Sequence, residues 1–307
     1  MSKRDGLLAT LKATLLLKTI KLLSTITMQS FTNIRGLIID MDGVLWHGTE
    51  AIPGLIEFFD TLNDLNIRFI LATNNASLTP AQYVTKLAKM GVSITEDKIL
   101  TSGLATALFL SQEFNPKTTT VFVIGVDGAT QPLLELGFTL TGLYEVKNAA
   151  NPNKGADIVV CGKDETLSWD KLATATLNIR AGARFIGTNG DTTLPTEHGV
   201  THGNGAILAG LELATGIKPT IIGKPEPIMY QQAMALLETN PEETVAIGDR
   251  LETDILGAVR TNINSIMVLT GISSAEDLET SDYQPTWVMQ DIIEITETLK
   301  QQRPKYQ

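Results

Sequence analysis

The chain has 307 residues, 43% hydrophobic and 19% charged, a balance typical of a folded protein with one large domain or two smaller ones. Its formal net charge of −10 argues against a nucleic-acid partner, because such partners require a basic surface. Cys161 is the single cysteine, which excludes an intrachain disulfide and makes a reducing, cytoplasmic location the natural expectation.

The first 27 residues differ from the rest in charge. They hold five basic residues and one acidic residue, a net charge of +4, against −14 for the remainder. Lysines interrupt their apolar residues too often for a membrane span or a secretory signal, although the composition also fits a transit peptide. Because the fold pattern begins at Ile34, we expect residues 1–30 to be a floppy extension or the result of a misplaced start, with Met28 as the initiator. A helix lying on a membrane surface is the lesser alternative.

A buried strand is predicted at residues 37–39, and two carboxylates follow it. The strand ends at Asp40, and Asp42 and Gly43 come next. In parallel α/β sheets, ligands bind at the carboxyl ends of the strands. Two carboxylates this close repel each other and need a cation, a shared proton or separate tasks. Taken alone, this run is also compatible with an acidic surface turn.

Helices and strands then alternate. Helices are predicted at residues 54–66, 79–90 and 104–114, with a strand at 67–72. The strand runs into Thr73, Asn74 and Asn75, so a hydroxyl and two amides stand at its end. The second helix has a capping Thr79 and a proline in its first turn. Alternation of this kind predicts a doubly wound parallel sheet.

A second domain is predicted inside the first. About 150 residues separate Thr73 from Lys224, far more than one strand–helix unit needs. We expect an α/β cap at residues 115–200, between two parts of a core at 31–114 and 201–300. Its predicted elements are strands at 121–125, 158–161 and 184–187 and a helix at 169–181. Cys161 ends one of these strands and is expected to be a core residue rather than a nucleophile.

Two further strand ends carry charged groups once the core resumes. A segment at 221–225 contains Lys224, and a strand at 245–248 ends at Asp249, with Asp254 five residues further on. The other elements predicted here are helices at 203–213, 227–238, 253–260, 275–278 and 291–299, a strand at 265–269 and a solvated tail at 301–307. Glu252 is expected to face solvent.

These strand ends read DMDGVL, TNN, GKP and GDRLETD, in that order, and resemble the motifs of the haloacid dehalogenase (HAD) superfamily of phosphohydrolases. The resemblance spans roughly residues 35–295. The place of the cap is similar to that in subfamily IIA, the type-two capped p-nitrophenyl phosphatase and phosphoglycolate phosphatase branch. It implies a HAD-like Rossmannoid core and a phosphatase that works through an aspartyl-phosphate.

The resemblance also implies roles for the acidic residues. Asp40 would be the nucleophile, and Asp42 the general acid and later the base. Asp40, Asp249 and the peptide carbonyl of Asp42 would hold Mg²⁺, an ion that prefers oxygen ligands. Asp254 would support the metal from behind or reach it through water.

Phosphate would be bound by the remaining motif residues. Thr73 would donate to a phosphoryl oxygen with help from the backbone at Asn74 and Asn75, and Lys224 would neutralise negative charge. In the cap, Asp191 and Leu194 would belong to a specificity loop that resembles the family's TN-x-D segment. Leu194 falls where relatives acting on phosphoglycolate are similar, whereas Gly190 departs from the usual residue.

The resulting hypothesis is a Mg²⁺-dependent phosphatase of small phosphorylated metabolites, with phosphoglycolate or p-nitrophenyl phosphate as candidate substrates. The alternatives are a phosphotransferase, a nucleotide or pyridoxal phosphate phosphatase, and a non-catalytic protein that binds a phosphorylated metabolite. Neither a nucleic-acid partner nor a membrane span is expected. Relatives with such caps often pair through them, which leaves a homodimer open. His47, His198 and His202 are not assigned catalytic roles.

Overall fold

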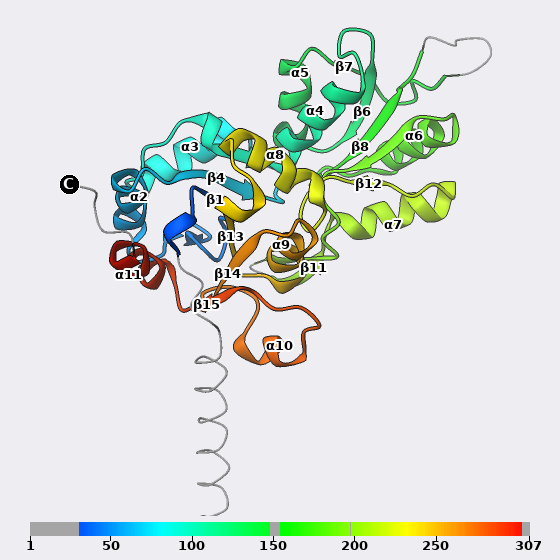
Figure 1. Cartoon of the computed structure of the whole chain (residues 1–307). Helices are drawn as coiled ribbons and strands as arrows, with labels where there is room; N and C mark the ends of the chain where they lie inside the picture. Colours follow the sequence, from blue (N-terminus) through cyan, green and yellow to red (C-terminus); the bar gives the residue numbers. More distant parts are fainter. Residues whose placement is uncertain (1–30, 148–153, 197, 303–307) are drawn as a thin grey trace, which may run out of the picture.

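The computed structural model describes residues 31–147, 154–196 and 198–302, so the expectations for residues 1–30 and for most of the C-terminal tail lie outside the described residues. Two parallel sheets organise the chain (Figure 1). The first contains six strands, and its order is β15 (Trp287–Met289), β14 (Asn264–Val268), β13 (Thr244–Gly248), β1 (Gly36–Ile39), β4 (Arg68–Thr73) and β5 (Ile99–Thr101).

Strand β1 lies near the centre of this core sheet. It pairs in parallel with β13 on one side and β4 on the other, with Ile38 opposite both Ala246 and Ile70. All four of its residues are buried, as expected for a strand covered on both faces. The register aligns the ends of the three strands, so Asp40, Thr73 and Asp249 leave the same edge of the sheet.

Helices cover both faces of the core sheet. Alternate strand residues point to opposite faces, so Ile39 packs with one group of helices and Ile38 with the other. The first face is covered by α2 (Leu55–Asp64), α3 (Pro80–Lys89) and α11 (Ile292–Gln302). The second is covered by α4 (Ser102–Glu113), α8 (Pro227–Leu237) and α9 (Leu256–Arg260). The expected doubly wound α/β fold is thereby confirmed.

The cap is a second parallel sheet (Figure 1). Its strands, in spatial order, are β12 (Thr220–Ile221), β9 (Arg184–Gly187), β8 (Ile158–Cys161), β6 (Thr120–Ile124) and β7 (Thr139–Leu140). Helices α6 (Trp169–Arg180) and α7 (Asn204–Thr215) pack on one face, whereas α5 (Asp127–Glu135) and the core helix α4 pack at the other. One continuous apolar cluster around α4 therefore joins cap and core.

The cap extends further along the chain than residue 200. We expected residues 201–300 to belong to the core, but β12 pairs with β9 of the cap sheet. Helix α7 buries Leu208 and Leu211 against the cap strands. The difference has a physical reason: an amphipathic helix looks the same in sequence whichever sheet receives its apolar face. The chain returns to the core just before Lys224.

Several short elements were not expected from the sequence. These are the hairpins β2 (Trp46–His47)–β3 (Glu50–Ala51) and β10 (Thr193–Thr196)–β11 (Gly199–His202), strands β5, β7 and β15, helix α5 and the 3₁₀ turns Phe31–Asn33, Glu96–Lys98 and Pro241–Glu243. Helix α10 (Ala275–Thr280) lies where the sequence predicts a helix at 275–278. Elements this short lack the periodicity on which recognition depends. Among the described residues, none of the helices has the length and apolar character needed to cross a bilayer.

Candidate active site

A cavity of about 1,100 Å³ lies where the strand ends of the core face the cap. The core contributes Asp40, Asp42, Thr73, Lys224, Asp249 and Asp254 to its wall, and the cap contributes Lys163, Asn189, Asp191, Leu194, His202 and Asn204. All four motifs found in the sequence thus open into one space, as expected for the carboxyl edge of a parallel sheet.

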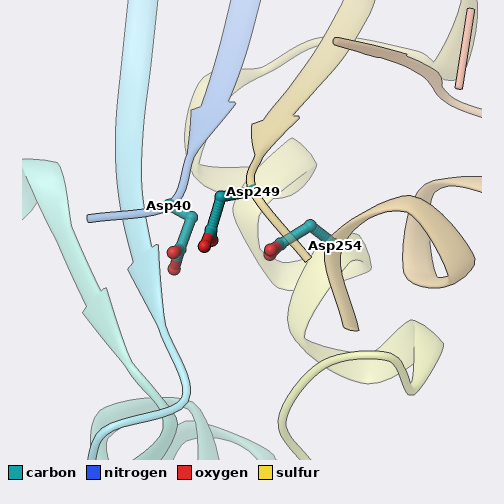
Figure 2. A group of neighbouring side chains, drawn as sticks. All are labelled: Asp40, Asp249 and Asp254. Carbon is teal, nitrogen blue, oxygen red and sulfur yellow. The ribbon is translucent and has the colours of Figure 1, made fainter. Parts of the chain in front are cut away.

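Three carboxylates meet in this cavity (Figure 2). Asp40 and Asp249 follow β1 and β13, and Asp254 lies in the π-helical turn Leu251–Ile255. One oxygen from each carboxylate lies within 4.8 Å of the other two. Three hard oxygen donors at such distances fit a divalent cation. A π-turn inside a helix is itself frequent at functional sites, since it redirects one side chain.

Lys224 is buried between two of these carboxylates. Its Nζ donates to Asp40 Oδ1 at 2.6 Å, to Asp254 Oδ1 at 2.7 Å and to the carbonyl of Ala72 at 3.1 Å. The side chain is only 4% exposed. Burial alone lowers the pKa of Lys224, but the attraction of Asp254 and Asp40 outweighs it, and the pKa lies well above its usual value. The ammonium group therefore stays charged.

The carboxylates titrate unusually because of burial. Burial raises the pKa of Asp40 well above its usual value, against the lowering effect of Lys224. Burial, followed by repulsion from Asp254, raises the pKa of Asp249 to about 6. Without a cation, the site holds more negative charge than one lysine neutralises, so bound positive charge would favour the ionised carboxylates.

A loop after β14 fixes Asp249. The backbone N–H of Ile272 donates to Asp249 Oδ2 at 2.7 Å, and that of Ser273 donates to the Asp249 carbonyl at 3.0 Å. Two glycines let this loop and the turn after Asp42 come close to the Asp249 carboxylate. A Cβ at Gly271 would lie 1.8 Å from Asp249 Oδ2, and one at Gly43 would lie 2.6 Å from the same atom.

Thr73 and Asn75 form the end of β4 beside this cluster. Thr73 is buried, and its Oγ1 accepts from the backbone N–H of Asn75 at 3.1 Å. The Asn75 side chain closes a turn by accepting from the N–H of Ser77 at 2.8 Å. The Thr73 hydroxyl hydrogen can therefore be directed to a ligand, while the Asn75 amide oxygen shapes the loop.

Asn74 joins three segments instead of pointing freely into the cavity. Its Oδ1 accepts from the N–H of Lys224 at 2.7 Å, and its Nδ2 donates to the Lys224 carbonyl at 2.8 Å. The same Nδ2 lies 3.1 Å from Asp191 Oδ1 of the cap, and the Asn74 carbonyl accepts from Asn189 Nδ2 at 2.8 Å. The Asn74 side chain thus positions Lys224 and ties cap to core, whereas the resemblance assigned only the Asn74 backbone to phosphate binding.

The cap residues expected in a specificity loop do reach the cavity. Asp191 lies beside Asn74, and burial raises its pKa. Leu194 lies on β10 and lines the cavity. His47 and His202 also line the cavity, whereas His198 is exposed on the β10–β11 hairpin. Cys161 is buried, as expected of a core residue: burial raises its pKa to about 12, and its thiol donates to Asn204 Oδ1.

Sequence reasoning missed three groups that contact the site residues. They are the backbone of Ile272, the Asn189 amide and the Trp46 indole, whose Nε1 donates to Asp42 Oδ1 at 2.8 Å. The Ile272 N–H contacts a residue more than 20 positions away in the chain, and the Asn189 amide contacts one more than 100 positions away. The sequence has no signal for such contacts. Trp46 directly follows the first motif, and its position four residues after Asp42 is the signal that could have identified it as a donor to that carboxylate.

A doubly wound core that presents carboxylates, a buried lysine and a hydroxyl to a covering α/β cap defines a class, the capped phosphohydrolases. Family models agree: residues 37–139 match the haloacid dehalogenase-like hydrolases, and residues 221–295 match a second HAD-hydrolase-like model. The chain belongs to the HAD superfamily, in subfamily IIA, and is a phosphomonoester hydrolase. The family predicted from the motifs is thereby confirmed.

Individual relatives match over nearly their whole length. The chain is 37% identical over 260 residues to the 5′-nucleotidase YutF of Bacillus subtilis, covering 85% of this chain and 96% of that protein. It is 36% identical over 268 residues to the acid sugar phosphatase of Staphylococcus saprophyticus, covering 87% and 99%. The crystal structure of 4-nitrophenylphosphatase from Thermotoga maritima superposes with a TM-score of 0.78 at 33% identity, covering 87% and 98%.

The contact between Gly271 and Asp249 gives a first prediction. Gly271→Ala is expected to displace the Asp249 carboxylate, because the new Cβ would overlap Oδ2. Divalent-metal affinity should fall by about 10- to 100-fold, the usual cost of disturbing a group that supports a metal ligand. Titration calorimetry with Mg²⁺ would measure it. Gly210→Ala is the control, since nothing lies within 4 Å of its Cβ position; unchanged affinity in both proteins would contradict the prediction.

Proposed function

We propose that the chain is a Mg²⁺-dependent phosphatase that hydrolyses small phosphomonoesters through an aspartyl-phosphate on Asp40. One observation carries the proposal: the Asp40 carboxylate stands at the cavity floor, bound by the buried Lys224 at 2.6 Å and clustered with Asp249 and Asp254. A carboxylate held in this way is aligned for attack, and the charges around it match those of a transferring phosphoryl group.

In the first step, an Asp40 oxygen attacks phosphorus as the bond to the leaving oxygen breaks. Lys224 and the Thr73 hydroxyl stabilise negative charge on the phosphoryl oxygens, since both line the cavity beside Asp40. Asp42 gives its proton to the leaving oxygen. Asp42 is exposed to the cavity rather than buried with Asp40, which suits a group that must reach the leaving oxygen.

In the second step, Asp42 takes a proton from water, and the water oxygen attacks phosphorus. The bond between phosphorus and the Asp40 oxygen breaks, which releases inorganic phosphate and leaves Asp40 as a carboxylate and Asp42 as a protonated acid again. Lys224 is charged at the start because Asp254 and Asp40 raise its pKa, and Asp254 still contacts it while Asp40 carries the phosphoryl group.

The residues present fit a magnesium ion. Asp40 and Asp249 would hold it with the peptide carbonyl of Asp42, and Asp254 would support it while also binding Lys224. When bound, the ion supplies positive charge that neutralises the phosphoryl group and lets it approach the carboxylate. The raised pKa values of Asp40 and Asp249 are what such a cation would reverse.

Substrate size follows from the cap. Cap residues close one side of a cavity of about 1,100 Å³, so small phosphorylated metabolites fit better than macromolecules. The names of the relatives suggest sugar phosphates and nucleoside monophosphates, and p-nitrophenyl phosphate as a convenient probe. Leu194 in the cavity wall keeps phosphoglycolate among the candidates.

The experiment that tests this function measures phosphate release from p-nitrophenyl phosphate, phosphoglycolate, pyridoxal phosphate, sugar phosphates and nucleoside monophosphates. It is run with Mg²⁺ and with a chelator. Release that requires Mg²⁺ is expected, and the ranking of substrates would identify the preferred class. Binding of these compounds without release would overturn the proposal in favour of a binding protein, and transfer to an added alcohol would favour a phosphotransferase.

The titration of Asp249 gives a prediction about pH. Its pKa of about 6 in the metal-free protein means that it is protonated below that pH, and a protonated carboxyl does not bind a cation. Mg²⁺ affinity should therefore fall by about tenfold or more per pH unit below 6, because Asp40, whose pKa is also raised, gains a proton as well. Calorimetry between pH 5 and 8 would measure this. An affinity independent of pH over that range would contradict it.

A further inference from the structure

The indole of Trp46 makes a polar contact inside the site that no motif identifies. Trp46 is fully buried, and its Nε1 donates to Asp42 Oδ1 at 2.8 Å. A buried indole N–H needs an acceptor, because leaving it unpaired costs the hydrogen bond that water would supply. Here the acceptor is a carboxylate exposed to the cavity, so a buried and rigid group holds a more mobile one.

The backbone fixes where Trp46 lies relative to Asp42. The N–H of Gly43 donates to the Trp46 carbonyl at 2.8 Å, closing the turn that separates the two residues. Trp46 then opens the hairpin β2–β3 by pairing with Ala51. The two side chains are therefore joined through a short, hydrogen-bonded turn, which fixes the backbone from which the indole extends.

Helix α3 fixes the orientation of the indole ring. The Tyr83 ring stacks on it with centroids 6.3 Å apart and planes 23° apart, and Lys86 Nζ lies 4.1 Å from its centroid. Tyr83 is also buried, and its helix begins with a Thr79 capping box. The ring is thus packed by a helix that is itself well anchored, and its N–H has one direction in which to point.

The hydrogen bond engages Oδ1 of an Asp42 carboxyl group that lines the cavity. A carboxylate without such a partner would sample several side-chain rotamers at an exposed position. Proton transfer requires the donor within hydrogen-bond reach of the leaving oxygen, so a fixed rotamer matters directly for the reaction.

We propose that Trp46 is a positioning residue that holds the Asp42 carboxyl in the orientation needed to protonate the leaving group. This inference rests on the proposed function, in which Asp42 is the general acid. Trp46 acts through the Asp42 side chain and makes no contact with the phosphoryl group. The effect of replacing Trp46 should depend on how much protonation the leaving group requires, which distinguishes Trp46 from a residue needed only for folding.

The test compares leaving groups of similar size and different acidity. For Trp46→Phe and the wild-type protein, kcat/KM is measured with p-nitrophenyl, phenyl and benzyl phosphates. Because p-nitrophenolate leaves without much protonation, Trp46→Phe should lower kcat/KM for benzyl phosphate about tenfold more than for p-nitrophenyl phosphate. Equal losses for all three substrates, or no loss, would overturn the inference.

Two further proteins keep this test decisive if Trp46→Phe folds poorly. Replacement of Trp46 by 3-benzothienylalanine retains the fused ring and removes only the N–H donor, and should show the same dependence on the leaving group. Trp287→Phe is the matched control, because it alters an indole on β15, which is not part of the cavity wall. Hydrolysis by the wild-type protein tests the proposed phosphatase function separately. A failure of the Trp46 inference is therefore distinguishable from a failure of that function.

Discussion

Asp40→Asn protein is expected to release no phosphate above background, a loss of about 10⁵-fold or more, as for other enzymes deprived of their nucleophile. The amide has the size of the carboxylate but cannot form the aspartyl-phosphate. The fold should survive, because Lys224 keeps its 2.7 Å contact with Asp254. Stability of the metal-free variant should equal or exceed that of wild type, since burial disfavours the ionised Asp40.

The loss of activity would be measured as phosphate release under saturating substrate. The stability would be measured by thermal unfolding in the presence of a chelator. Asp60→Asn, at an exposed position on α2, is the matched control and should retain full activity. Turnover by Asp40→Asn at even a hundredth of the wild-type rate would remove Asp40 from the role of nucleophile and with it the proposed mechanism.

Lys224→Met should have the largest effect on stability and also abolish activity. Lys224 is almost completely buried and donates to Asp40 and Asp254, and its loss leaves both carboxylates without their cation. Breaking a buried ion pair from one side typically costs about 3–5 kcal/mol. The loss should be greatest above pH 7 and shrink as the pH falls, because the pKa of Asp40, already raised, rises further and protonation removes the unpaired charge.

Chemical unfolding of the metal-free protein at pH 5 and pH 8 would check both the size and the sign. Lys300→Met is the control, since Lys300 pairs with Glu57 at the surface and its side chain is 48% exposed. Exposed pairs of this kind contribute less than about 1 kcal/mol. A Lys224→Met protein as stable as the control variant, or one destabilised more at pH 5 than at pH 8, would contradict the electrostatic account.

Much of the site follows from the order of motifs in the chain. Asp40, Thr73 and Asp249 were each predicted at a strand end, and in a parallel sheet all such ends meet at one edge. The structure brings them together with Lys224 around one cavity. Alternation of helices and strands was similarly sufficient for the fold class, since buried parallel strands are apolar throughout and their crossover helices are amphipathic.

Contacts between segments distant in the chain could not be predicted in this way. Asn74 bonds to the backbone of Lys224, 150 residues away, and to Asp191 of the cap. An asparagine after a strand is equally compatible with a phosphate ligand, a turn or a clamp, and only the neighbours supplied by folding distinguish these. The same holds for the N–H of Ile272, whose donation to Asp249 depends on a loop passing within 3 Å.

The sequence by itself determined the class of fold, the family and the set of groups available for chemistry, because periodicity and motif spacing are local properties of the chain. The tertiary structure decided which sheet receives α7 and β12, which oxygen of Asp42 is held by Trp46, and how burial shifts the pKa values of Asp40 and Asp249. These outcomes depend on packing and desolvation, which arise only when distant segments are brought together.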